Sequence, residues 1–533
     1  MASYLRKPHV LEGWRDRPYA LRNSETGAIR PLSRREFEIV RRLDDPCETG
    51  ADGLGETGAG EPKGPGETST DAAALDPAAF ARLAVQGYIT DDVAQAASPA
   101  YHYHNRLQRN VVQLSVTDRC NFHCRHCMAT DGSFAGRGEL SLPELDSLFS
   151  QMGELGIPYI EFTGGEPLVR RDFVRIVDMA ATAGLRIRRI YTNGSLLGSE
   201  LLDQLRALGQ KPDFFISFDG LGVHDWMRGV PGAEQAALAA MDLVRDAGFP
   251  LTASVNFNEK TAPVFEQTCR HLVFERGAGA LHLMRTAPLP TWRAALAEDG
   301  RPCPAPAASP ARSSSSGSST AAPDSRAPAD PFDCSAYFEA MLSLLKTAHD
   351  EKWPAMLDIL HMPALHHGPI RPEALAHIAN PPAATGREKT MACCPKACSI
   401  VFIASDGRVL PCSACEGASL AWGVMDDDDV NIRSAALRDI LSSSSYAKRY
   451  EETVADMLEK ERRCRGCRWL SLCRGGCPLA RLAGAHQPTL SQSCQLFKDG
   501  YFERYLEAIG VNLDDYRGDA PCAALRDMVK ETA

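Results

Sequence analysis

Three cysteines in one short segment are the residues of this chain best suited to chemistry. Cys120, Cys124 and Cys127 follow the spacing C-x3-C-x2-C. Three thiolates from a single loop can bind three irons of a cubane cluster, which leaves the fourth iron open for a substrate or cofactor. A zinc ion held by these thiolates together with His123 or His126 is the alternative that the spacing leaves open.

The other cysteines are unevenly distributed along the chain. It has 18 cysteines, and the densest group lies between Cys393 and Cys494. The start of the chain lacks the apolar core of a signal peptide, so we expect a cytoplasmic location, where thiols stay reduced. Clustered cysteines with short spacings then indicate metal or iron–sulfur ligands. The isolated cysteines are expected to be ordinary thiols: Cys47, Cys269, Cys303, Cys334 and Cys522.

Length and charge exclude some classes of protein. The chain has 533 residues and a formal net charge of −10. This length suggests about two to four domains. The acidic balance argues against a nucleic-acid partner, whose binding surface should be basic. No run of about 18 apolar residues occurs, so we expect no membrane-spanning helix and no membrane partner.

Strand and helix patterns alternate between residue 111 and about residue 290. The strand candidates are 111–117, 158–163, 186–192, 213–218, 251–257 and 280–285, with helical patterns between them, for example 142–154, 171–183, 198–207 and 233–247. This alternation predicts an α/β fold with a parallel sheet, and six such units fit a partial (β/α)6 barrel. The site should lie at the carboxyl ends of the strands, and the cysteine loop directly follows the first strand.

Residues 1–95 are predicted to form a small separate domain. A turn between two apolar stretches predicts a hairpin. Ser33 with Glu36 forms a capping box before one helix, and Asp76 precedes a proline at the start of another. Residues 48–72 are rich in Gly, Glu and Thr and are expected to be a disordered insertion. A hairpin with helices in so short a segment is winged-helix-like.

The rest of the chain divides by composition. Residues 105–300 should form the partial barrel, and the Pro-, Ala- and Ser-rich residues 301–331 a flexible linker or insertion. A helical bridge is expected over 332–390 and a cysteine-rich iron–sulfur domain over 391–510. Residues 511–533 are then a C-terminal tail.

Several segments resemble the radical S-adenosylmethionine (SAM) superfamily. The loop 120–127 matches its signature loop, and Gly-Gly-Glu-Pro at 164–167 matches its GGEP motif at the end of the second strand. Tyr-Thr-Asn-Gly at 191–194 resembles its TNG segment, and residues 217–228 resemble its "S-x-D-G…HD…R" stretch. His126 is a departure, because many relatives carry an aromatic residue just before the third cysteine.

The resemblance implies cofactors and residue roles. Cys120, Cys124 and Cys127 would hold a [4Fe–4S] cluster that binds SAM. The GGEP segment would hold the methionyl amino group, and the planar donor fork of Arg228 suits the cofactor carboxylate together with Ser217. The implied cofactor contacts are Gly164, Gly165, Glu166, Pro167, Asn193, Ser217, Arg228, Ser254 and Asn256, the last two as ribose contacts.

The C-terminal cysteines resemble the seven-cysteine SPASM domain, which usually carries two auxiliary [4Fe–4S] clusters. Carried over by position, the first cluster would take Cys394 or Cys393, Cys398, Cys412 and Cys477, and the second Cys464, Cys467, Cys473 and Cys494. Four thiolates each would leave no open iron, which suits electron transfer or structure. Cys415 is an additional candidate, and a zinc ribbon is the alternative for 464–477.

Together these resemblances imply an oxidoreductase that matures a peptide. The cluster would cleave SAM, and the resulting 5′-deoxyadenosyl radical would remove a hydrogen atom from the substrate. SPASM proteins commonly modify peptides, and the N-terminal unit is similar to the winged-helix element that recognises precursor peptides. The expected partners are therefore a ribosomally made precursor peptide, bound by β-augmentation, and an electron donor such as flavodoxin or ferredoxin.

The sequence does not decide which product the enzyme forms. We favour an intramolecular thioether or carbon–carbon crosslink, because auxiliary clusters offer a route for oxidation; epimerisation is an alternative. A sulfatase-maturing enzyme is a second alternative, although Ser413 follows Cys412 where those relatives typically place an Asp. A non-catalytic, zinc-containing peptide-binding scaffold is a third.

Overall fold

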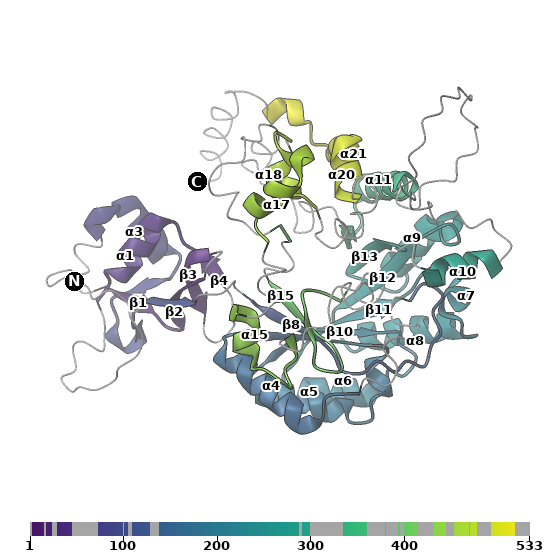
Figure 1. Cartoon of the computed structure of the whole chain (residues 1–533), viewed down its shortest axis with the longest axis horizontal. Helices are drawn as coiled ribbons and strands as arrows, with labels where there is room; N and C mark the ends of the chain where they lie inside the picture. Colours follow the sequence, from purple (N-terminus) through teal and green to yellow (C-terminus); the bar gives the residue numbers. More distant parts are fainter. Residues whose placement is uncertain are drawn as a thin grey trace, which may run out of the picture.

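The computed structural model describes the N-terminal and central parts of the chain and several C-terminal segments (Figure 1). The described residues are 3–14, 17–23, 29–44, 73–99, 101–104, 109–127, 138–286, 290–298, 334–359, 379, 393–394, 399–413, 430–443, 452–467, 469–476 and 492–516. The insertions expected at 48–72 and 301–331, and most of the expected tail, lie outside these ranges.

A nine-stranded sheet, ordered β14-β13-β12-β11-β10-β9-β8-β15-β16, forms the centre of the fold. Its strands from β8 to β13 are consecutive in the chain and mutually parallel. They are Val111–Ser115 (β8), Tyr159–Thr163 (β9), Arg186–Thr192 (β10), Asp213–Ser217 (β11), Leu251–Phe257 (β12) and Ala280–Arg285 (β13). The predicted alternating strands and the parallel α/β sheet are therefore confirmed.

Helices cover one face of this sheet (Figure 1). The connecting helices include Leu142–Glu154 (α4), Phe173–Thr182 (α5), Ser199–Ala207 (α6), Ala233–Asp246 (α8) and Phe265–Phe274 (α9). Alternate strand residues such as Leu114, Phe162 and Leu283 are buried with the apolar sides of the helices in one large core. Because successive side chains of a strand point to opposite faces, the residues between them lie on the inner face of the sheet.

The sheet is longer than the sequence indicates, because three further strands come from residues after α9 and β13. The helix expected after residue 332 is found as Ser335–Asp350 (α11), but Met356–Ile359 is not helical and forms β14, parallel to β13. Pro354, which disfavours a helix interior, separates the two. At the other edge, Ile400–Ile403 (β15) pairs in parallel with β8 and returns as Val409–Leu410 (β16).

The N-terminal part has its own core and two small sheets. The four-stranded sheet is ordered β4-β3-β2-β7, formed by His9–Trp14 (β2), Arg17–Asn23 (β3), Ile29–Pro31 (β4) and Tyr101–His104 (β7). The three-stranded one joins Tyr4–Arg6 (β1), Ile89–Thr90 (β5) and Ala96–Ala97 (β6). The β3–β4 pairing confirms the predicted hairpin, while β7 carries the sheet past residue 95.

The two predicted helices of this part are confirmed with their caps. Arg34–Arg41 (α1) begins with the Ser33–Glu36 capping box, and Pro77–Val85 (α3) begins at Asp76. Their apolar sides pack with strand residues such as Leu11 and Leu21 in a core separate from that of the barrel.

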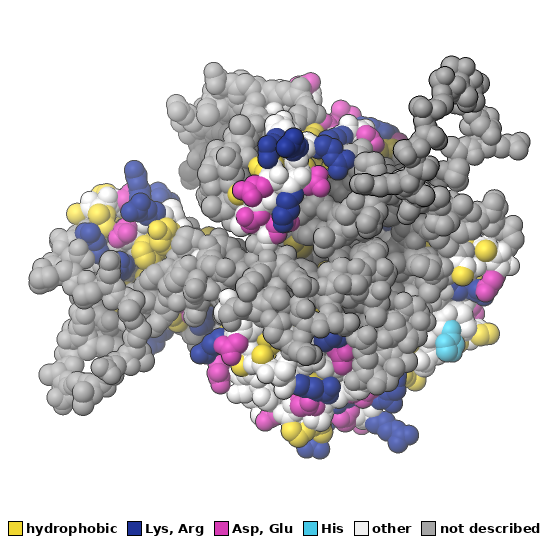
Figure 2. Space-filling model, viewed as in Figure 1, with side chains coloured by type: hydrophobic (Ala, Val, Ile, Leu, Met, Phe, Trp, Pro, Cys, Tyr) yellow, Lys and Arg dark blue, Asp and Glu magenta, His cyan; other side chains and the backbone are white. Residues whose placement is uncertain are grey.

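The C-terminal part contains several short helices and a cluster of aromatic rings. The helices are Val454–Lys460 (α17), Leu470–Cys473 (α18), Gln492–Lys498 (α20) and Tyr501–Ala508 (α21). Trp469, Phe497 and Phe502 pack their rings at centroid distances of 5.0–5.8 Å. Within the described ranges, no helix has the length and apolar character needed to cross a membrane. Basic and acidic side chains are interspersed over the face in Figure 2.

Candidate active site

The cysteine loop is fastened on one side to the end of β9. The amide of Gly165 donates to the Thr117 carbonyl at 2.8 Å, and the amide of Glu166 donates to the Arg119 carbonyl at 2.9 Å. A Cβ atom at Gly164 would collide with the Thr117 carbonyl, and one at Gly165 with the Arg119 carbonyl. The two glycines therefore allow two backbone segments to approach more closely than other residues permit.

On its other side the loop is fastened to the helix after β11, His224–Arg228 (α7). The amide of His123 donates to the Arg228 carbonyl at 3.2 Å, and that of Arg125 to the Met227 carbonyl at 2.9 Å. Gly229, at φ +67°, leaves room for the His123 carbonyl. The loop is thus held between the carboxyl ends of β9 and β11, where the sequence predicted the site.

The three thiols of the loop are close enough to influence one another. Burial, with smaller contributions from the charges of Cys124 and Cys127, raises the pKa of Cys120 to about 11. Burial also raises the pKa of Cys124, against the influence of the Arg228 guanidinium. Thiolates crowded in this way are stabilised by bound cations. The loop therefore fits an iron cluster.

No set of three His, Cys, Asp or Glu side chains converges as the ligands of a single ion would, so far as the described ranges go. The three loop thiols are included in this statement. Ligands of a cubane cluster each bind a separate iron, and this spread of the thiols does not conflict with such a cluster.

Glu166 links the ends of β9 and β10. Its buried carboxylate accepts hydrogen bonds from the Asn193 amide at 2.7 Å, the Thr192 hydroxyl at 2.8 Å and the Leu168 amide at 3.1 Å. Burial raises its pKa to about 7, although these donors oppose the shift. The carboxylate is turned toward β10, and its contact with the methionyl group stays a prediction. Pro167 follows as the buried first residue of a short 3-10 turn.

Asn193 connects β10 to the cysteine loop. Its side-chain amide donates to the Asn121 Oδ1 at 2.9 Å, and its own Oδ1 accepts from the Ser195 amide at 2.9 Å and the Ser195 hydroxyl at 2.7 Å. The Asn121 side chain in turn donates to Ser195 at 2.8 Å. The residue next to Cys120 is thereby held by the TNG segment.

Arg228 lies between a loop cysteine and a buried carboxylate. Its Nε and Nη2 atoms lie 2.8 and 3.1 Å from the two oxygens of Asp219, and its Nη1 lies 3.6 Å from the Cys124 sulfur. Burial would raise the pKa of Asp219, but Arg228 and neighbouring histidines lower it to about 2. Asp219 is therefore ionised, and the guanidinium is fixed beside the cluster loop.

The Asp219 carboxylate also contacts a fourth strand end, that of β12. Asn256 donates to Asp219 Oδ1 at 3.1 Å and lies 3.4 Å from the Nε2 of His126. Burial lowers the pKa of His126 to about 4, so its ring is neutral at physiological pH. Cys124 and His126 are thus both connected, through Arg228, Asp219 and Asn256, to the ends of β11 and β12.

The remaining predicted contacts lie on the inner face of the sheet. Ser217 and Ser254 are register partners on β11 and β12, and both are half-buried. Register partners in a sheet point to the same face. The structure therefore places both side chains on the face that also carries Asn256.

The C-terminal cysteines are described only in part. Cys398, Cys415 and Cys477 lie outside the described residues. Burial raises the pKa of Cys473 to about 12, with contributions from Cys494, Cys464 and Cys467. The four cysteines predicted for the second auxiliary cluster are therefore neighbours in space, and their role as ligands stays a prediction.

For the first auxiliary cluster, three described thiols can be placed. Cys393 is buried in a small core with Met457 and Leu470, while Cys394 and Cys412 are half-buried. Among the isolated cysteines, Cys269 is buried in α9 and Cys334 at the start of α11, which is consistent with ordinary core thiols.

Some residues of the site carry no separate sequence signal. Asp219 lies within the recognised motif, yet its pairing with Arg228 becomes visible only in the structure. His282 on β13 and Asp358 on β14 meet on the inner face at 2.7 Å. They come from distant segments, and the sequence pattern does not predict the strand β14.

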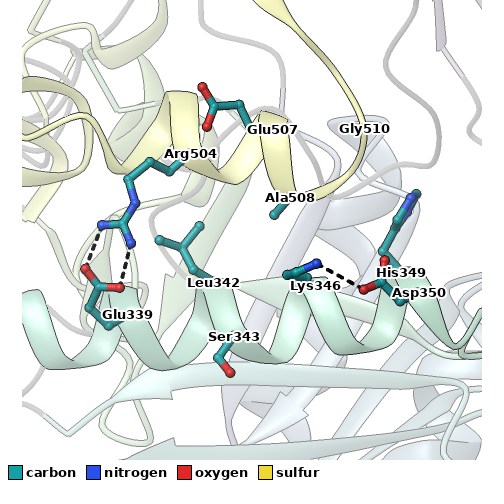
Figure 3. Close-up of a pocket in the computed structure, with 10 residues that line it drawn as sticks. All are labelled: Glu339, Leu342, Ser343, Lys346, His349, Asp350, Arg504, Glu507, Ala508 and Gly510. Carbon is teal, nitrogen blue, oxygen red and sulfur yellow. Dashed lines mark hydrogen bonds and ion pairs between the residues drawn. The ribbon is translucent and has the colours of Figure 1, made fainter.

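A groove of about 580 Å³ lies apart from these residues, between α11 and α21 (Figure 3). Four of its charged side chains form two pairs: Arg504 binds Glu339 through two hydrogen bonds of 2.6 and 2.8 Å, and Lys346 binds Asp350. None of the predicted site residues lines it, and we assign it no role in catalysis.

Comparison with known proteins identifies the central segment. Residues 114–272 match the sequence profile of the Radical SAM superfamily, so the chain contains a radical SAM domain. It is similar to the AdoMet-dependent heme synthase of Methanosarcina barkeri, with 33% identity over 180 residues, which are 33% of this chain and 51% of that protein. The chain thus spans about half the length of this curated relative.

Solved structures resemble a larger part of the chain. Streptococcus suis SuiB bound to precursor peptide SuiA matches with a TM-score of 0.57 and 12% identity, covering 92% of this chain and 100% of that one. Native anSMEcpe with bound AdoMet and Cp18Cys peptide matches with a TM-score of 0.50 and 15% identity, covering 76% and 98%. At these identities the likeness is one of fold.

Proposed function

We propose that this chain is a radical SAM enzyme that forms an intramolecular crosslink in a ribosomally made precursor peptide. The observation that carries the proposal is the cysteine loop held between the ends of β9 and β11 in a radical SAM domain. The peptide substrate is supported by fold: the likeness to SuiB, whose structure holds its precursor peptide, extends over 92% of this chain.

The cofactor site combines the cysteine loop with the strand ends around it. A [4Fe–4S] cluster on Cys120, Cys124 and Cys127 would supply one electron to SAM, whose cleavage provides a radical for hydrogen abstraction. Arg228, held by Asp219, would present a fixed positive charge to the methionine carboxylate. Ser217 would bind the same carboxylate, and Ser254 and Asn256 would face the ribose from the inner side of the sheet. Asn193 positions the loop through Asn121.

The N-terminal domain would select the peptide as a winged-helix-like recognition element. Its four-stranded sheet ends at β4 on one side and β7 on the other. An edge strand offers unpaired backbone groups, so a leader peptide can extend such a sheet by β-augmentation. The segment to be modified would then reach the inner face of the barrel, where the cofactor contacts lie.

The C-terminal cysteines would hold auxiliary [4Fe–4S] clusters. The mutual influence of Cys464, Cys467, Cys473 and Cys494 supports a four-thiolate site. A cluster with four protein ligands suits electron transfer, which crosslinking needs because it removes electrons from the peptide. A reducing compartment such as the cytoplasm, with flavodoxin or ferredoxin as donor, fits this chemistry.

Anaerobic incubation with SAM, a reductant and a small peptide encoded beside this chain tests the proposal. We expect 5′-deoxyadenosine and a peptide lighter by two hydrogen atoms, measured by mass spectrometry. An unchanged mass with deuterium gained from solvent would favour an epimerase instead, and modification of a sulfatase peptide the sulfatase-maturing alternative.

Two controls make the test decisive. Cys124→Ala should abolish 5′-deoxyadenosine, whereas Cys269→Ala, which alters a buried thiol of α9, should not. A colourless chain with stoichiometric zinc and no SAM cleavage would support the peptide-binding scaffold and overturn the proposal.

A further inference from the structure

The inner face of the barrel carries a row of polar side chains that crosses several neighbouring strands. Strand positions that alternate with the helix-facing core include Glu161 on β9, Arg189 on β10, Asp213 on β11, His282 on β13 and Asp358 on β14. Charged groups are rarely placed on a largely buried surface unless they are paired or functional. Each of these groups therefore calls for a partner or a role.

Most of this row is satisfied internally. Arg189 lies 3.7 Å from both Glu161 and Asp213, and its guanidinium stacks over Phe215. Glu161 also accepts a hydrogen bond from Tyr191 at 3.1 Å, and the Thr252 hydroxyl lies 2.9 Å from both oxygens of Asp213. These contacts form a structural layer across β9 to β12. Within this layer the charges of Glu161, Arg189 and Asp213 balance one another.

His282 and Asp358 form a separate pair at the edge of that layer. The Nδ1 of His282 lies 2.7 Å from Asp358 Oδ2, and the two side chains are 16% and 26% exposed. An ionised carboxylate can only accept hydrogen bonds, so Nδ1 is the donor and carries a proton. In the neutral ring Nε2 is then the basic nitrogen. This is the arrangement of a general base whose tautomer a carboxylate fixes.

The pair also lies at the level of the cofactor contacts. Ser217 of β11 is the register partner of Ser254 on β12, which is the partner of His282, which is the partner of Asp358. Register partners share a face and a height in the sheet. The His282 ring packs against that of Phe215, another side chain of the inner face, with ring centroids 5.6 Å apart. A substrate held against the nucleoside would therefore meet the imidazole.

We infer that His282 is the general base that accepts the substrate proton during bond formation, with Asp358 as its positioning residue. The inference rests on the proposed function. After a hydrogen atom has left one peptide carbon, that carbon bonds to an X–H group of the peptide, where X is sulfur, nitrogen or an aromatic carbon. The X–H proton moves to Nε2 of His282, and the one electron released would be accepted by an iron–sulfur cluster that the C-terminal cysteines would hold. One bond forms, one X–H bond breaks, and one proton and one electron leave.

The first test separates proton transfer from hydrogen abstraction. In His282→Gln, SAM cleavage that depends on the peptide should persist, and deuterium from a labelled peptide should still enter 5′-deoxyadenosine. Crosslinked product per 5′-deoxyadenosine should fall on the order of 10²-fold, the usual contribution of a general base. Asp358→Asn should lower the ratio less, and Asp358→Glu should restore part of it.

A matched control pair lies outside the barrel. His271 and Glu275 of the α9 region form the same kind of pair, at 3.0 Å, on the helical side of the sheet. His271→Gln should leave the product ratio at the native value. A native ratio in His282→Gln would overturn the inference, as would an equal loss of cleavage and product, since both results leave no distinct step for the base.

The second test needs no turnover. Nitrogen-15 NMR of the histidines in the full-length chain should show the His282 proton on Nδ1 in the native protein and a loss of that preference in Asp358→Asn. An unchanged tautomer would refute the pairing on which the inference depends. Absence of SAM cleavage in the native enzyme would instead refute the proposed function, and the tautomer measurement would still decide the role of Asp358.

Discussion

The two cysteine-rich regions of this chain are held in place in different ways. The backbone of the first loop is hydrogen-bonded to Glu166 beyond β9 and to Arg228 beyond β11, residues far away in sequence. In the C-terminal region, the amides of Cys464, Cys467 and Cys473 bond to residues three or four positions earlier. This difference indicates that the barrel holds the first loop in its binding conformation without metal. In the second region, bound metal would contribute more to the folded structure.

The largest effect should come from removing the thiols of the two cysteine-rich regions in separate variants. Replacing Cys120, Cys124 and Cys127 by Ala should remove one cluster's worth of iron and abolish SAM cleavage, because the open iron is lost. Replacing Cys464 and Cys467 should also lower the iron content but should leave SAM cleavage measurable while crosslinking fails. Iron analysis and 5′-deoxyadenosine assays check this. An equal loss of SAM cleavage in both variants would show that the two cysteine-rich regions do not differ in their role in this reaction.

Two ion pairs, one beside the first loop and one between α11 and α21, should differ strongly in their contribution to stability. Arg228→Gln leaves the buried Asp219 carboxylate without its cation, which costs about 3–5 kcal/mol of unfolding free energy. Arg504→Gln breaks a pair with Glu339 whose side chains are about half exposed, and should cost about 0–1 kcal/mol. Anaerobic urea unfolding measures both. Similar losses of unfolding free energy in the two variants would show that the Arg228–Asp219 pair does not anchor the first loop as a buried ion pair.

Glu166 should give the first region a distinct pH dependence. Its pKa is raised from 4.5 to about 7 by burial, so the folded state holds a proton that the unfolded state has released between these values. The unfolding free energy should therefore fall as pH rises from 4.5 to 7, by about 3 kcal/mol at most. In Glu166→Gln, the unfolding free energy measured with urea should depend less on pH. The same pH dependence in the native protein and the variant would contradict this prediction.

A smaller effect is expected from a single methyl group at the loop anchor. Gly165→Ala would push a Cβ against the Arg119 carbonyl, and we expect a loss of about 1–3 kcal/mol together with weaker SAM binding. Gly153→Ala in α4 is the control, because a Cβ added there would meet nothing within 4 Å, and a helical Ala should be neutral or slightly stabilising. Calorimetry of SAM binding measures the difference; an unaffected Gly165→Ala variant would show that the close approach is dispensable.

Much of the barrel follows from local patterns in the sequence. Strands β9 to β13 and helices α4, α6 and α8 fall at or within a residue or two of the predicted ranges, because their apolar periodicities differ clearly. The Ser33–Glu36 capping box marks a helix start that the sequence alone defines. The position of the cysteine loop at a strand end follows from the same alternation.

Other features depend on contacts that no local pattern encodes. Strand β14 follows a helix and a proline and is recognisable only by its pairing with β13. The Arg228–Asp219 pair and the His282–Asp358 pair need the three-dimensional sheet to bring their partners together. Strands buried on both faces do not reveal which polar residues point inward, and so the inner layer could not be predicted.

The central claim is that three thiolates leave one iron open and that SAM binds there. Electron paramagnetic resonance of the reduced full-length chain, with and without SAM, tests it most directly. We predict a cluster signal that changes on adding SAM and is absent from the Cys120, Cys124 and Cys127 triple variant. A spectrum that SAM leaves unchanged, or a SAM-dependent change that survives in that variant, would contradict the claim.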